Sequence, residues 1–137
     1  MRTALDTNVL SALWSDEPLA SQIASSLGEA RSQGGLVICA PVFAELLAHP
    51  SVTESFVEQF LRETSIAVDF DLEEDVWRQA AKSFAAYARR RRRSAGDSPK
   101  RLLVDFVIAS HALLRADRLM TLDAKRYSQD FPRLRLC

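Results

Sequence analysis

Four acidic residues interrupt or directly border segments whose apolar composition is typical of a protein core. Two follow short strand-like runs and two lie near the beginning of helix-like segments; they are Asp6, Asp123, Glu45 and Asp105. Burying several carboxylates together is unfavourable and raises their pKa values unless positive charge lies close by. A shared cation would remove this cost, so the four positions are candidate metal ligands.

The chemistry of these side chains indicates which cation they would bind. Mg²⁺ and Mn²⁺ prefer oxygen ligands, keep several waters and need only a few carboxylates. Zinc is disfavoured, because the only histidines, His49 and His111, have neither the number nor the spacing of a zinc site. We therefore expect one or two Mg²⁺ or Mn²⁺ ions, which would lower the pKa of a bound water and polarise a scissile phosphate.

Each acid also has a simpler interpretation when it is considered alone. Asp6 could cap the following helix, and Asp105 could cap the helix after Pro99. Glu45 could be an exposed helix residue, and Asp123 could start a turn. Their common placement favours one site instead, because strand ends and helix starts share one edge of a parallel α/β sheet.

Strand-like and helix-like segments alternate along the chain around these acids. Strands are predicted at residues 4–5, 36–40, 66–70 and 118–122, with a further strand at 134–136. Helices are predicted to begin after residue 6, at 16–18 and at 41, to span 52–64, 73–92 and 102–115, and to include a short turn near 125. The clearest loop is 94–99. This order predicts an α/β sandwich with a mainly parallel central sheet of four to five strands.

Helical periodicity also predicts which side chains face the core. In the helix over 73–92 they are Val76, Trp77, Ala80, Phe84 and Tyr87. In the helix over 102–115 they are Leu103, Phe106, Val107, Leu113 and Leu114. A second stripe of that helix carries Asp105, Ala109, Ala112 and Ala116, whose small side chains predict open space beside the carboxylate.

Length and composition predict a single domain over residues 1–137. A chain of 137 residues with 47% hydrophobic composition can bury one core but is too short for two ordinary domains. Two cysteines do not make a disulfide framework, which favours a reducing compartment. No signal-like opening or membrane-length apolar run is found, so we expect a cytoplasmic protein.

Positive charge is concentrated in one segment although the formal net charge is zero. Against a single acid, Asp97, this segment carries Arg89, Arg90, Arg91, Arg92, Arg93, Lys100 and Arg101. These side chains could contact RNA phosphates. They could equally be a solvated helix end whose cations complement the C-terminal dipole, and the two roles can coexist.

At the four acids and their neighbours the chain resembles PIN-domain ribonucleases, and more narrowly the VapC-type toxins of bacterial toxin–antitoxin pairs. The similar fragments, in order, are Ala4–Leu10, Pro41–Leu46, Asp105–Ala109 with Ala112, and Thr121–Asp123. The resemblance implies that Asp6, Glu45, Asp105 and Asp123 form the metal-binding and catalytic set. It makes Thr7, Asn8 and Thr121 supporting polar residues. The arginine run is outside the family pattern.

The resemblance further implies Mg²⁺- or Mn²⁺-dependent endonucleolytic cleavage of RNA. It implies a homodimer that is inhibited by a small cognate antitoxin. A groove for a partner helix would then lie among the apolar helices that carry Leu10, Leu13, Trp14, Phe56 and Phe60.

Two other functions compete with this interpretation. Phosphatases of the haloacid dehalogenase type also begin with an aspartate at the end of a first strand, but they require a second acid two residues later, where this chain has Asn8. A binding module of the same fold could hold RNA on its basic segment without cleaving it. The presence of all four acids argues against this second alternative.

Overall fold

The computed structural model describes residues 1–15, 17–94 and 100–137, over which strands and helices alternate as the sequence predicts. The strands are β1 (Thr3–Leu5), β2 (Leu36–Cys39), β3 (Ile66–Asp69) and β4 (Arg118–Met120). The helices are α1 (Thr7–Ser15), α2 (Glu17–Gln33), α3 (Ala40–Leu47), α4 (Glu54–Glu63), α5 (Glu74–Arg93), α6 (Leu103–Arg115) and α7 (Ala124–Ser128).

The central sheet confirms the predicted α/β class. Within the described residues it has four strands in the order β3-β2-β1-β4, and every pairing is parallel. The predicted strand at 134–136 forms only an isolated parallel bridge between Leu119 and Leu136. The predicted strand at 36–40 is one residue shorter, because Ala40 already begins α3.

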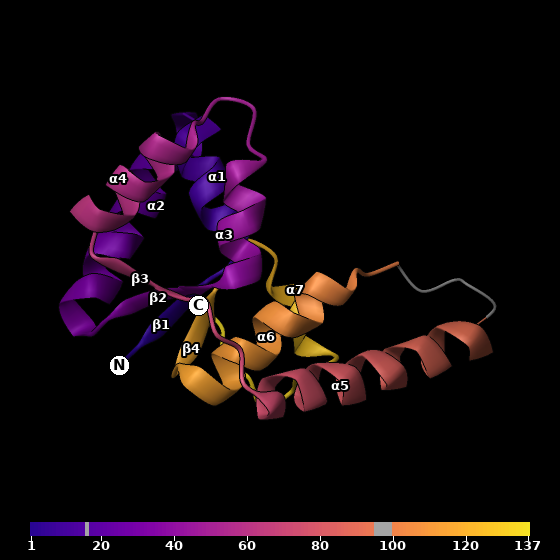
Figure 1. Ribbon diagram of the computed structural model, residues 1–137. Helices are drawn as coiled ribbons and strands as arrows, with labels where there is room; N and C mark the ends of the chain where they lie inside the picture. The colour runs from indigo at the N-terminus through magenta and orange to yellow at the C-terminus, as the bar shows by residue number, and fades with distance from the viewer. Residues whose placement is uncertain (16, 95–99) are drawn as a thin grey trace.

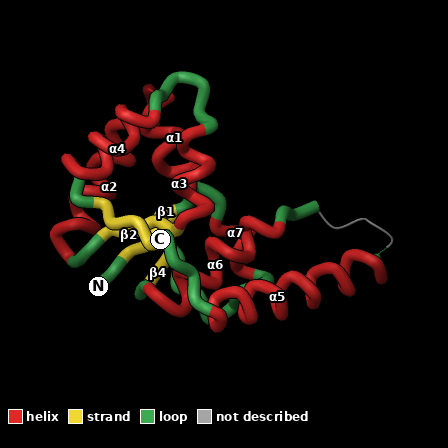
Figure 2. Tube along the Cα trace, viewed as in Figure 1, coloured by secondary structure: helices red, strands yellow, loops and turns green. Residues whose placement is uncertain are grey.

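Helices cover both faces of this sheet. Figure 1 shows α1 to α4 grouped on one side of the strands and α5 and α6 on the other, and Figure 2 shows the same layers with the strands enclosed between helices. The interior strands β1 and β2 are buried at every position, which explains their continuous apolar sequence. No helix in the described part of the chain is long and apolar enough to cross a membrane.

Helix α6 is the most enclosed helix of the molecule. It contacts α5, α3, β1 and β4, and every residue from Phe106 to Ala112 is buried. The predicted open space along its alanine stripe is therefore wrong, since Ala109 and Ala112 are fully buried in the core. Leu103 and Leu114 are exposed at 47% and 38%, so the predicted core face is only partly right.

Trp77, on α5, is a further residue whose predicted burial is wrong. Its exposed fraction is 49%, whereas the buried residues of α5 are Val76, Ala80, Ser83 and Tyr87. One residue along an α-helix rotates the side chain by roughly 100°, so a residue directly after Val76 points away from this stripe.

The C-terminal half of α5 is fastened to the rest of the fold by one buried carboxylate. The Asp130 side chain is 2% exposed and forms ion pairs with Arg90 and, at 3.6 Å, with Arg101. The Tyr87 hydroxyl also accepts a hydrogen bond from the Arg101 backbone N–H at 2.6 Å. Of the predicted loop, Ser94 forms the C-cap of α5 and residues 95–99 lie outside the described residues.

Asp130→Ala should destabilise the protein, because it leaves two partly buried guanidinium groups without their shared carboxylate. We expect the free energy of unfolding in urea to fall by about 2–4 kcal/mol. Arg78→Ala is the matched control, since its pair with Glu74 is exposed on the same helix, and its midpoint should stay close to that of the wild type. Equal effects of the two variants would contradict this role of Asp130.

Candidate active site

Asp6 lies at the carboxyl end of β1, next to the carboxyl end of β4, and is only 3% exposed to solvent. Its Oδ2 accepts hydrogen bonds from the Thr121 hydroxyl and the Tyr127 hydroxyl, both at 2.8 Å. Both donors are neutral, and within the described residues Asp6 forms no ion pair. The site therefore contains a buried carboxylate whose direct partners supply no positive charge.

Glu45 approaches this edge from α3, the helix that begins directly after β2. The Thr7 hydroxyl donates a hydrogen bond to Glu45 Oε1 at 2.5 Å, so the residue after Asp6 fixes this second carboxylate. Cys39 lies between the two acids at the end of β2. Burial raises the pKa of its thiol to about 11, and the charges of Glu45 and Asp6 add to this effect, so the thiol stays protonated at neutral pH.

Asp105 and Asp123 meet at the guanidinium group of Arg126. Arg126 Nη1 lies 3.5 Å from Asp105 Oδ1, and its Nε lies 3.3 Å from Asp123 Oδ2. Burial raises the pKa of Asp105 and the charge of Asp6 acts in the same direction, while Arg126 is the largest opposing influence. A cation supplied by the chain itself thus lies between these two acids.

The topology explains why the four acids lie along the same edge of the sheet. Helix α6 leads into β4 and runs back along the sheet, so its first turn, with Asp105, lies at the carboxyl edge. Asp6 and Asp123 follow β1 and β4, and α3 begins at the end of β2. Ligand sites of parallel α/β sheets lie at this edge.

The supporting polar residues connect the two loops that follow β1 and β4. The Thr121 hydroxyl, which donates to Asp6, accepts hydrogen bonds from the Asp123 backbone N–H at 3.1 Å and from Asn8 Nδ2 at 3.4 Å. Asn8 Oδ1 in turn accepts from the Leu122 backbone N–H at 3.2 Å. These hydrogen bonds therefore fix the positions of the two loops relative to each other.

The structure also tests the simpler roles of the acids. The Asp6 carboxylate bonds to Thr121 and Tyr127. Asp123 does begin a turn, because its backbone carbonyl accepts from the Arg126 N–H at 3.2 Å, although its side chain does not cap α7. Glu45 is half-buried and not an exposed helix residue. Asp105 does part of a capping function, because its Oδ2 accepts from the Leu102 backbone N–H at 3.4 Å while Oδ1 faces Arg126.

The donor set matches a hard divalent cation, although the side chains are not arranged around one. Every candidate ligand is a carboxylate or hydroxyl oxygen, as Mg²⁺ and Mn²⁺ prefer. Within the described residues no three acidic, histidine or cysteine side chains form a ready ligand cluster. The Arg126 side chain, which pairs with two of the acids, is 41% exposed and has space to turn outward. The residues therefore fit such an ion once Arg126 releases them.

Comparison with known proteins shows which family the chain belongs to. The family model of the PIN domain matches residues 3–132. The chain belongs to the PIN domain family. Two solved structures share its fold over the whole chain. The structure of VapBC2 from Rickettsia felis bound to a promoter DNA fragment has 20% sequence identity and a TM-score of 0.73, and the match covers 100% of this chain and 98% of that chain. The structure of VapBC-1 from nontypeable Haemophilus influenzae has 24% sequence identity and a TM-score of 0.68, and the match covers 100% of this chain and 97% of that chain. No curated protein matches the sequence.

Two residues at the candidate site of this PIN domain were not predicted from the sequence. Tyr127 is fully buried, and burial together with the charge of Asp6 raises its pKa, so its hydroxyl remains a donor to Asp6. Arg126 links Asp105 and Asp123. Their positions in the sequence, three and four residues after Asp123, were the feature that could have indicated a place near the site.

The basic segment of the PIN domain divides into different environments. Arg90 pairs with Asp130, and Arg89, Arg92 and Arg93 lie together on the outer surface of α5. Arg91, Arg92, Lys100 and Arg101 line a cleft. Arg90 to Arg93 form the last turn of α5, where their positive charges complement the negative end of the helix dipole.

Tyr127→Phe should destabilise the fold by removing one of the two hydroxyl groups that solvate Asp6. Hydrogen bonds to charged groups contribute about 1.5–3 kcal/mol, and we expect a loss of that size in the free energy of unfolding. In an Asp6→Asn background the same substitution should cost less, which a double-mutant cycle measures as a coupling energy. Equal costs in both backgrounds would show that Tyr127 acts by packing alone.

Proposed function

We propose that this PIN domain is a Mg²⁺- or Mn²⁺-dependent endoribonuclease and the toxin of a toxin–antitoxin pair. The observation that carries the proposal is a buried Asp6 carboxylate with only neutral hydrogen-bond donors, beside Asp105, Asp123 and Glu45 at the carboxyl edge of the sheet. Such a site gains from binding a cation, since the cation offsets the repulsion among the acids.

Asp6, Asp105, Asp123 and Glu45 would hold the metal ion in this proposal. When bound, such an ion supplies a water of lowered pKa and polarises the scissile phosphate. The Thr121 and Tyr127 hydroxyls orient Asp6, and Thr7 orients Glu45. The same neutral donors leave the negative charge of both carboxylates available.

Arg126 has two successive roles in this proposal. Without a metal ion, its guanidinium pairs with both Asp105 and Asp123 and offsets the charge repulsion between them. If Asp105 and Asp123 held a metal ion, the Arg126 side chain would be free to contact the substrate. A guanidinium binds phosphate oxygens in a bidentate way, so it would hold the scissile phosphate there.

The antitoxin, the homodimer and the cytoplasmic location are also proposals. Both structural matches are VapBC proteins, which supports a small antitoxin as partner. An apolar cleft of about 290 Å³ between α1, α2 and α4 would receive apolar side chains from the helix of such a partner; its lining includes Leu13, Leu27, Phe60 and Ile66. The exposed Trp77 and Phe70 offer an apolar surface for a second copy of the chain.

Asp6→Asn and Asp105→Asn keep side-chain size but remove negative charge, so each should abolish cleavage. We expect purified wild type to cut RNA with Mn²⁺ or Mg²⁺ and not with chelator, and the variants to lose on the order of 100-fold or more in rate. Asp71→Asn, at an exposed acid outside the site, is the matched control. Single-stranded DNA and a phosphomonoester are the comparison substrates.

Each other outcome of this assay points to a different function. Hydrolysis of the phosphomonoester alone would support a phosphatase, although the PIN family match over residues 3–132 argues against it. RNA binding without cleavage under any metal condition would support the non-cleaving module. Unchanged cleavage in both variants would contradict the metal-site proposal.

Arg126→Gln should increase Mn²⁺ affinity, because the ion no longer competes with a guanidinium for Asp105 and Asp123. The expected gain is about tenfold, measured by calorimetry or by the electron paramagnetic resonance of Mn²⁺. Lys125→Gln removes the same charge from the neighbouring exposed residue and should change the affinity much less. Equal affinities of wild type and Arg126→Gln would show that Arg126 does not occupy the ion's position.

A further inference from the structure

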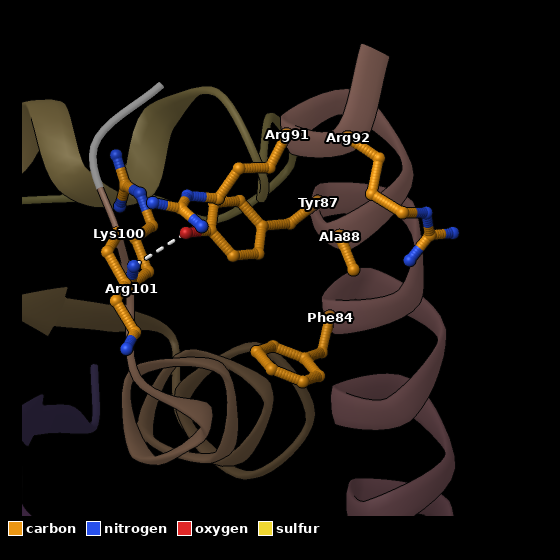
Figure 3. Close-up of a pocket in the computed structure, with 7 residues that line it drawn as sticks. All are labelled: Phe84, Tyr87, Ala88, Arg91, Arg92, Lys100 and Arg101. Carbon is orange, nitrogen blue, oxygen red and sulfur yellow. Dashed lines mark hydrogen bonds between the residues drawn. The ribbon is translucent and has the colours of Figure 1, made fainter. Parts of the chain in front are cut away.

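A cleft of about 660 Å³ lies between the C-terminal half of α5 and the chain at residues 100–101. Its described lining residues are Phe84, Tyr87, Ala88, Arg91, Arg92, Lys100 and Arg101, and none of them is acidic. Figure 3 shows Lys100 and Arg101 on one wall, which the Tyr87 hydroxyl reaches directly, with Phe84 and Ala88 on the α5 side. The cleft therefore combines an apolar floor with a positively charged rim.

The walls of the cleft are held in place by interactions already present. The Tyr87 hydroxyl accepts from the Arg101 backbone N–H, which fixes the 100–101 wall to α5 (Figure 3). Asp130 is shared between Arg90 and Arg101, so one carboxylate pairs with two guanidinium groups. A preformed site of this kind costs little ordering energy when a ligand binds.

The cleft is adjacent to the acid site. Arg101 lies on the cleft wall and Asp105 lies one helical turn further along the chain, at the start of α6. The Leu102 backbone N–H, directly after Arg101, donates a hydrogen bond to Asp105 Oδ2 at 3.4 Å. A chain of linked phosphates that crosses the cleft would therefore reach the candidate metal ligands.

We propose that this cleft binds a nucleotide of single-stranded RNA beside the bond that is cut. Lys100 and the neighbouring arginines would contact the phosphates, and the base would lie against Phe84 and Ala88. Single-stranded RNA is recognised in this way, by bases placed on aromatic side chains and by cations along the backbone. The proposal rests on the proposed ribonuclease function and adds where the substrate lies.

Binding of a short fluorescein-labelled oligouridylate tests the cleft separately from catalysis. All proteins carry Asp6→Asn and are measured with chelator, so that no cleavage occurs. Ala88→Glu places a negative side chain in the half-buried floor of the cleft, and Lys100→Glu reverses the charge at an exposed position of its wall. Ala85→Glu and Lys82→Glu make the same changes at exposed positions of α5 outside the cleft.

We expect each cleft variant to weaken binding about tenfold or more and to reduce the dependence of affinity on salt. The control variants should stay within about twofold of the parent, because long-range charge effects are screened. Lys100→Glu keeps the test valid if Ala88→Glu fails to fold, since Lys100 is exposed. Equal losses in cleft and control variants, or no loss in either, would overturn the proposal.

Failure of the cleft and failure of the ribonuclease function give different results. If the wild type cleaves RNA and the two cleft variants, with Asp6 restored, cleave and bind as the wild type does, only the cleft proposal is wrong. If the wild type binds the oligouridylate through the cleft but never cleaves it, the cleft stands as the site of a binding module. Tighter binding of duplex RNA than of the single strand would also overturn the cleft proposal.

Discussion

The burial of one carboxylate, Asp6, is the constraint on which the rest of the site depends. An ionised carboxylate is stable in the interior only when hydrogen bonds or opposite charge replace its lost water. Here two hydroxyl groups, from Thr121 and Tyr127, provide the hydrogen bonds without neutralising the charge. Both donors come from the segment after β4, so this segment has to pack over the end of β1. The acid cluster and the ordered C-terminal part of the chain are therefore consequences of the same interaction.

The parallel sheet and α6 position the other acids near Asp6. Two interior strands deliver their carboxyl ends to one edge, and the completely buried middle of α6 fixes the position of its first turn, where Asp105 lies. Arg126 then pairs with Asp105 and Asp123, while Asp130 pairs with Arg90 near the C-terminal end of α5. The chain thus carries negative charge at the carboxyl edge of the sheet and positive charge along the C-terminal half of α5.

Much of this arrangement could be predicted from the sequence, and the errors have a common physical cause. Short apolar runs that end in an acid identified β1 and β4, and the alternation of elements predicted a mainly parallel sheet. The PIN resemblance is confirmed by the family match. Trp77 and the alanine stripe of α6 were assigned wrongly, because periodicity gives a face but not the neighbour that covers it. Tyr127 was missed because its partner, Asp6, is 121 residues distant in sequence. No local pattern encodes such a contact.

The central claim is that the acids at the carboxyl edge form a binding site for a divalent cation. Anomalous X-ray diffraction from crystals grown with Mn²⁺ tests it most directly, because it locates the ion without reference to activity. The account predicts a Mn²⁺ peak among Asp6, Asp105 and Asp123, with Arg126 turned away from both of its present partners. A site without such a peak at saturating Mn²⁺, with Arg126 still between Asp105 and Asp123, would contradict it.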